Sequence, residues 1–123
     1  MILLTPELRE RLLDNGRCDG TDHVPVVKFL NPLGVGTRLA TEFDKDGDTL
    51  FGLADLGEPE LGSFSLSEVE SLRQLFGMGI ERDILFEDAF PLSVYAMAAR
   101  RAGSIVLSER LLRAAAAALR SEP

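Results

Sequence analysis

The sequence is poor in the residues from which disulfide frameworks, zinc centres and nucleophile-base pairs are built. Among 123 residues there is one cysteine, Cys18, and one histidine, His23. Cys18 therefore lacks a disulfide partner within the chain, and a structural zinc ion would lack its usual four ligands. Because a chain without disulfides is typical of a reducing compartment, we expect a cytoplasmic protein.

Long apolar runs and the commonest nucleotide-binding and hydrolase motifs are also missing. No run approaches the roughly 18 apolar residues of a membrane span. The start, MILLTPELRERLL, has no basic leader and predicts a helix. Gly34-Val35-Gly36 lacks the further glycine and the lysine of phosphate loops, and no Gly-x-Ser-x-Gly elbow occurs. We therefore expect no contact with a membrane, no cofactor and no bound metal.

The charge that is present is unevenly distributed along a chain with a net charge of −7. Residues 1–36 carry four basic and five acidic groups, residues 37–90 carry four and thirteen, and residues 91–123 carry five and two. Non-specific phosphate binding needs Lys or Arg to displace counterions, so the acidic middle of the chain disfavours it. Only the last third can offer a basic face.

Helical spacing, capping residues and strand alternation predict one α+β domain spanning 1–123. Helices are expected at residues 6–15, 67–76, 93–102 and 108–121, and strands at 24–30, 37–43, 49–56, 61–65 and 80–87. Both faces of 49–56 carry apolar residues, which predicts a central strand covered on both sides. We expect a mainly antiparallel sheet of four to five strands with three to four helices packed largely on one side.

The alanine-rich segment 108–121 is predicted to form an extra C-terminal helix capped by Ser108. One face of this helix carries its larger apolar residues and two alanines, namely Leu111, Leu112, Ala115, Ala116 and Leu119. Such a narrow stripe either packs closely on its own domain or makes a small contact in a homodimer.

Five blocks occur in an order that resembles a bacterial family known only as domain of unknown function 2958 (DUF2958). They are DHVPVVKF, LATEFDKDGDTLFGLADLG, ELGSFSLSEVESLR, IERDILF and LSVYAMAARRAG. The resemblance runs from about Leu3 to Ile105, and the tail after Val106 lies outside it. It implies a small cytoplasmic protein, often encoded on mobile elements beside genes for conjugation, antirestriction and DNA maintenance. It supplies no catalytic residues.

Acidic residues gather in the turn Asp44-Lys45-Asp46-Gly47-Asp48. The spacing resembles the start of an EF-hand, but Thr49 stands where the loop needs glycine, and the flanking segments are predicted strands. A hairpin turn is the favoured interpretation. The exposed acidic residues of this region are our candidates for binding a partner, namely Asp44, Asp46, Asp48 and Glu58.

Carboxylates at Glu42, Asp55 and Glu60 are the candidates for catalysis, with Glu58 nearby. Converging carboxylates are what metal-assisted hydrolysis or general acid-base catalysis needs. Asp and Glu also occur on any solvated strand face, and this interpretation is favoured. Two of these side chains buried together would reverse the preference.

The remaining candidates are polar side chains whose structural interpretation is favoured. Cys18 and His23 share one loop, but no oxyanion site accompanies them, so His23 or Asp22 is expected to brace the loop. Arg82 lies between two acidic neighbours and is predicted to pair with the acidic sheet. A basic cluster in the last third could contact nucleic acid, and it consists of Arg100, Arg101, Arg110, Arg113 and Arg120, with Tyr95 nearby.

These observations favour a non-enzymatic accessory or interaction module that binds a protein through its acidic middle or a sheet edge. The resemblance adds an association with DNA transfer, antirestriction or DNA maintenance. Two alternatives remain open. One is a nucleic-acid-binding protein that uses the arginines of the last third, and the other is a metal-assisted hydrolase that uses the three carboxylates.

Overall fold

The computed structural model describes residues 2–18, 20–32, 35–76, 79–87 and 89–121, with the side chains of residues 73–76 left out. Its elements in chain order are α1 (Pro6–Gly16), β1 (Val27–Leu30), β2 (Thr37–Phe43), β3 (Thr49–Asp55), β4 (Pro59–Ser65), α2 (Leu66–Phe76), β5 (Glu81–Arg82), α3 (Leu92–Ala102) and α4 (Ile105–Ser121). The predicted α+β class is confirmed. Within the described ranges no helix is long and apolar enough to cross a membrane.

The five strands form one antiparallel sheet in the order β4-β3-β2-β1-β5. The turn between β2 and β3 is the predicted hairpin. Asp46 Oδ1 accepts hydrogen bonds from the amides of Asp48 and Thr49, each at 2.8 Å. Gly47 has a φ of 74°, which a glycine adopts without strain. Asp46 and Gly47 therefore shape the turn.

A bulge in β2 places Leu39 and Phe43, four positions apart, on opposite faces of the sheet. The register with β3 shifts between Ala40 and Glu42. Leu39 packs in one apolar cluster, whereas Ala40 and Phe43 pack in the other. Beside the bulge, a Cβ on Gly52 would lie 1.8 Å from the Leu39 carbonyl oxygen, so only glycine fits there.

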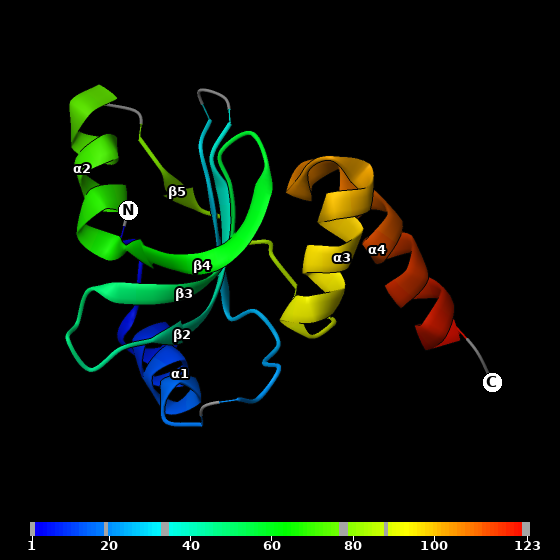
Figure 1. Cartoon of the computed structure of the whole chain (residues 1–123), viewed down its shortest axis with the longest axis horizontal. Coiled ribbons are helices and arrows are strands. Elements are labelled where there is room, and N and C mark those ends of the chain that lie inside the picture. Colours follow the sequence, from blue (N-terminus) through cyan, green and yellow to red (C-terminus); the bar gives the residue numbers. More distant parts are fainter. Residues whose placement is uncertain (1, 19, 33–34, 77–78, 88, 122–123) are drawn as a thin grey trace.

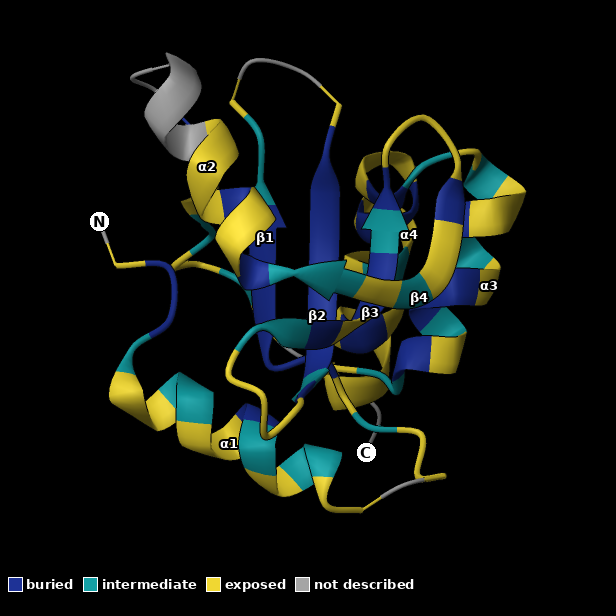
Figure 2. Cartoon of the chain, turned by 60° about the vertical axis from the view of Figure 1, so that its left-hand side comes forward, coloured by how far each residue is buried: buried dark blue, intermediate teal, exposed yellow. Residues whose placement is uncertain are grey.

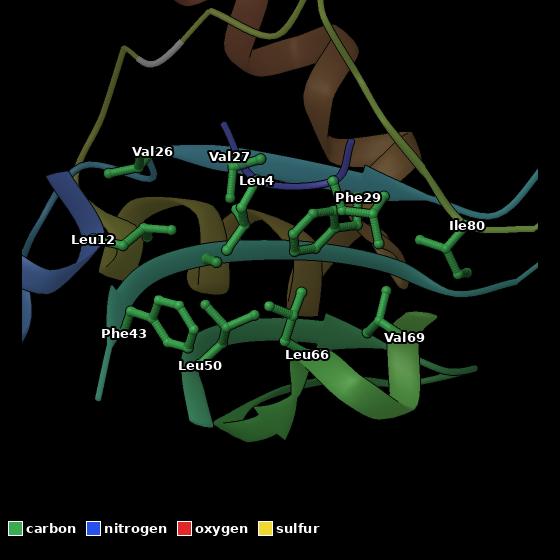
Figure 3. Packing of buried hydrophobic residues seen from close by; sticks show 12 residues of the cluster. Leu4, Leu12, Val26, Val27, Phe29, Phe43, Leu50, Leu66, Val69 and Ile80 are labelled. Atoms are coloured by element: carbon green, nitrogen blue, oxygen red, sulfur yellow. The ribbon is translucent and has the colours of Figure 1, made fainter. Parts of the chain in front are cut away.

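The helices cover both faces of the sheet, because residues of α1 and α2 pack in one apolar cluster and residues of α3 and α4 pack in the other (Figure 1). The expectation that they pack largely on one side is therefore wrong. We call the α1/α2 side the first face; its cluster includes Leu12, Phe29, Phe43 and Val69 (Figure 3). The α3/α4 side is the second face, where Leu39 and Leu53 meet Ala96, Ala99 and Ile105. Apolar residues at adjacent strand positions point to opposite faces, so one layer of helices could not cover them. Figure 2 shows the buried strands between the two layers.

Several element boundaries differ from those predicted: β1 starts at Val27 instead of residue 24, and β4 starts at Pro59 instead of residue 61. The strand expected at 80–87 stops at Arg82, because Asp83 starts a turn in which its Oδ1 accepts the Leu85 amide at 3.0 Å. Helix α4 starts at Ile105 instead of Ser108. Asp55 Oδ2, from the end of β3, accepts the Ile105 amide at 3.0 Å and caps the helix, while Ser108 is buried within it.

Candidate functional site

A cavity of about 440 Å³ lies on the second face, between residues 83–87 and 89–90, α3 and α4. We call it the α4 pocket. Three aromatic rings line it, with the centroid of Tyr95 at 6.4 Å from that of Phe86 and 6.3 Å from that of Phe90. The amide of Ala89 donates to the Tyr95 hydroxyl at 3.3 Å, which ties the segment to α3. Such spacing and tilt are typical of stable aromatic contacts, so this wall is preformed.

Buried charges border the α4 pocket. Lys28 Nζ donates to the two carboxylate oxygens of Glu109 at 2.6 and 2.9 Å, and Asp83 Oδ2 lies 3.5 Å away. The side chains of Lys28 and Glu109 are only 8% and 7% exposed. Lys28 reaches α4 because its neighbours Val27 and Phe29 point to the first face. One cation between two carboxylates leaves net negative charge here.

The rim of the α4 pocket carries charges of both signs. Arg113 and Arg120 of α4 line one side, and Asp83 and Glu87 line the other. The two arginines are seven residues apart, so they share one side of the helix at a rise of about 10.5 Å. Neither arginine forms an ion pair with any residue that the structure describes. Both guanidinium groups remain exposed to solvent.

The three candidate catalytic carboxylates lie at different places on the sheet. Asp55 is buried, and besides capping α4 its Oδ1 accepts the Gly57 amide at 3.1 Å. Glu42 pairs opposite Phe51, four residues along β3 from Asp55. Glu60 pairs with Ala54 and therefore lies on the opposite face of the sheet from Asp55. The described ranges contain no group of three His, Cys, Asp or Glu residues that could hold a metal ion.

The acidic candidates for partner binding are exposed except Asp48, which is half-buried, and two of them hold the backbone in place. Asp48 accepts hydrogen bonds from the Ser65 hydroxyl at 2.7 Å and the Ser67 amide at 2.8 Å, which caps α2. These bonds lower the pKa of Asp48, and bonds from Thr49 lower the pKa of Asp46. Asp44 and Glu58 are also exposed. Their role in binding stays a prediction.

The loop with Cys18 and His23 has the structural geometry expected of it. His23 Nε2 lies 3.2 Å from the backbone oxygen of Cys18, so this imidazole contact is not with the thiol. Asp22 accepts the Ser93 amide at 3.0 Å and also the Ser93 hydroxyl. Ser93 thereby lowers the pKa of Asp22, and the carboxylate braces the start of α3.

The arginines of the last third separate into two groups. Arg100 and Arg101 are exposed at the end of α3, and Arg110 is exposed on α4 away from the pocket. Arg113 and Arg120 line the pocket. The predicted basic cluster is thus divided, and only part of it borders the cavity.

Two arginines of the sheet have different surroundings. Arg82 pairs opposite Phe29 at the sheet edge and is half-buried, and its predicted ion pair stays a prediction. Arg38 was not a candidate, yet it is buried and donates to the Gly36 oxygen at 2.9 Å. Burial lowers the pKa of Arg38, with Glu68 acting in the opposite direction.

Sequence reasoning did not single out Lys28, Glu109, Phe86 or Phe90. A signal for the ion pair exists, because Lys28 interrupts an apolar strand and Glu109 is the one acidic residue of α4. The two lie 81 positions apart, and nothing in the pattern pairs them.

The family model described as "Protein of unknown function (DUF2958)" matches residues 3–106, so this chain belongs to that family. The match ends at the start of α4, and Glu109, Leu112, Arg113 and Arg120 therefore lie beyond it. No curated protein and no solved structure matches the chain significantly.

Proposed function

We propose that this member of the DUF2958 family is a non-enzymatic interaction module that binds an apolar segment of a partner protein in the α4 pocket. The aromatic wall of the pocket carries this proposal. Phe86 and Phe90 are half-buried and contact the buried Tyr95, and rigid aromatic side chains in a concave site are how binding hot spots are built.

Exposed apolar residues beside the pocket support binding of a protein segment. Ile84 and Leu85 are 71% and 83% exposed, and Leu85 lines the cavity. Large apolar side chains held in contact with solvent next to a hydrophobic groove are typical of interaction sites. A partner that covered them would remove this area from water.

Chemistry at the candidate carboxylates has less support than binding. Asp55 uses both oxygens to hold backbone amides, and Glu42 and Glu60 lie elsewhere on the sheet. A general acid or base must reach a substrate proton, and a metal site needs converging ligands. The observed positions favour a structural role for Asp55.

The cellular setting of this module is part of the proposal. We place it in the cytoplasm, as an accessory to DNA transfer, antirestriction or DNA maintenance encoded on mobile elements. The support for this setting is the expectation raised by the resemblance in the sequence analysis, together with the single cysteine. The acidic residues Asp44, Asp46, Asp48 and Glu58 remain a second candidate surface for the partner.

Site-specific photocrosslinking in living cells tests whether the pocket is the interface. A photoreactive amino acid replaces Leu85 in the pocket or, as the matched control, the 64% exposed Leu107 of α4, which lies outside the pocket. We expect a defined protein adduct from position 85 only, and its loss in Leu112→Asp, which places a charge in the pocket wall. Equal adducts from both positions, or none from position 85, would contradict the proposal.

The same experiment separates two alternatives. An adduct of twice the mass of the chain from position 107 would indicate a homodimer through the exposed face of α4, where Leu111 and Leu119 are also exposed. Attachment to DNA from residues near Arg100 and Arg101 would favour the nucleic-acid alternative.

A further inference from the structure

The shape of the α4 pocket suits a segment of protein chain. Its lining along α4 runs from Glu109 to Arg120. Eleven residues of helix rise about 16 Å, or three turns. A lining of this length matches a few turns of a packed helix or a short extended peptide. The choice between these two ligands rests on the proposed function and on the charges of the rim.

The charges on the rim select against a polyanion. Arg113 and Arg120 would attract phosphates, but Asp83 and Glu87 on the opposite wall would repel them. The negative charge of Glu109 is only partly neutralised, because its partner Lys28 also lies near Asp83. A bound segment with acidic groups toward α4 and basic groups toward the 83–87 wall would be complementary to both rims.

The spacing of the two arginines selects a helix over a strand. Carboxylates matched to Arg113 and Arg120 must stand about 10.5 Å apart on one side of the ligand. In a helix, residues i and i+7 lie on one side at this rise. In a strand the same distance corresponds to about three residues, and residues three apart point to opposite faces.

We propose that the α4 pocket binds an amphipathic α-helix of the partner protein, with acidic residues seven apart on one flank and basic residues on the other. Its apolar stripe packs on Phe86, Phe90 and Leu112. Its acidic flank lies along Arg113 and Arg120, and its basic flank faces Asp83 and Glu87. This is the helix-in-groove mode of recognition.

The test uses a synthetic helix as its probe. The peptide spans about three heptads, is locked as a helix by side-chain lactams, and carries Leu at positions a and d, Glu at e and Lys at g. A second peptide carries Lys at both flanks. Fluorescence anisotropy of the labelled peptides measures their affinity for the full chain.

We expect saturable binding of the Glu/Lys helix, weakened about tenfold by Arg113→Glu combined with Arg120→Glu, because two attractions become two repulsions. Arg110→Glu is the matched control on the same helix and should change the affinity less than about twofold, since Arg110 does not line the pocket. The second peptide, with Lys at both flanks, should bind the double variant more tightly than it binds the unaltered chain. If the two arginines only maintained the fold, their replacement would weaken the binding of both peptides and would not strengthen that of the second.

Three results would overturn the assignment. One is equal weakening by Arg110→Glu and by the double variant. Another is equal binding of the two peptides by the unaltered chain. The third is displacement of the bound helix by a single-stranded oligonucleotide at similar concentration, which would favour nucleic acid. If no helix binds but position 85 still gives its adduct, the helix assignment fails and the proposed function stands; if both fail, both are wrong.

Discussion

The two faces of the sheet are built from the same strands but differ in how completely they are closed. The first face buries Leu12, Phe29 and Phe43 in a continuous apolar cluster (Figure 3). The second face has a smaller apolar cluster bordered by the Lys28–Glu109 ion pair and the α4 pocket. The first face also holds a buried cation, Arg38, whose guanidinium carbon lies 6.0 Å from the centroid of the Phe64 ring. The buried ion pair and the α4 pocket lie on the second face, so we infer that the first face mainly stabilises the fold and the second carries the site.

The strands serve both faces because their side chains alternate, and in β2 a bulge changes that alternation. The bulge between Ala40 and Glu42 redirects β2, and Gly52 permits the close approach of Leu39. Close packing on one side does not need close packing on the other, so binding surface can be kept without loss of the main core.

The largest difference in lost stability is expected between the replacement of two phenylalanines, one on each face. Phe29→Ala should lower the free energy of unfolding by about 3–5 kcal/mol, since its fully buried ring leaves a cavity. Phe90→Ala should cost about 1 kcal/mol, because its half-buried ring already borders the pocket. Urea unfolding of both variants measures this, and equal losses would contradict the comparison.

The ion pair should also contribute strongly when only one partner is removed. Glu109→Ala leaves Lys28 buried with Asp83 alone, and we expect a loss of about 3 kcal/mol, the lower end for a broken buried pair. Combining Lys28→Met with Glu109→Leu should recover most of it, because no unpaired charge remains. Double-mutant analysis by urea unfolding measures both. A double variant no more stable than Glu109→Ala would argue against the pairing.

The cap on α4 should have a smaller and local effect. Asp55→Ala removes the acceptor for the Ile105 amide and should cost about 1 kcal/mol. Amide hydrogen exchange should accelerate in α4, while the protection of α1 stays unchanged. Uniform acceleration across both faces would show that α4 is not loosened independently.

The smallest expected effect is a change in how the stability of the fold depends on pH in acid. The pKa values of Asp48 and Asp22 lie below the ordinary 3.8, because Ser65 and Ser67 donate to one carboxylate and Ser93 to the other. A carboxylate with a lowered folded-state pKa stabilises the folded protein fully above its unfolded pKa, and this contribution is lost as pH falls through the folded pKa.

Asp48→Asn should therefore make the protection of amides in α2, on the first face, depend less on pH. Asp22→Asn should do the same for the amides of α3, on the second face. Exchange measured between about pH 5 and pH 2 compares the slopes. Unchanged slopes in both variants would show that these hydrogen bonds do not contribute.

Much of the fold could be predicted because its signals are local. Thr5 and Pro6 mark the start of α1, and the alternation in Thr37–Phe43 marks β2. The start of α4 was misplaced at Ser108, although Ser104 is a local cap whose Oγ accepts the Leu107 amide at 3.0 Å. Only the second acceptor, Asp55 on the Ile105 amide, lies fifty positions earlier. The bulge that puts Leu39 and Phe43 on opposite faces leaves no sequence signature beyond Gly52.

The site was less predictable than the fold. Arg113 and Tyr95 were recognised as part of a basic cluster, but their pocket depends on contacts between segments far apart in the chain. Glu109 and Lys28 each interrupt an apolar pattern, and only the packing of α4 on β1 makes them a pair. Distant pairing of this kind has no local period from which to predict it.

The most direct test of the division between the faces uses the chain's sole tyrosine and its lack of tryptophan. Tyr95 lies in the α4 pocket, so its intrinsic fluorescence reports on that site without a label. Tyr95→Phe combined with Phe64→Tyr moves the reporter to the first face. Titration with an unlabelled Glu/Lys helix should change the Tyr95 signal saturably and leave the fluorescence of this double variant unchanged. An unchanged Tyr95 signal at saturating helix, or an equal change from both reporters, would contradict the claim that the second face carries the site.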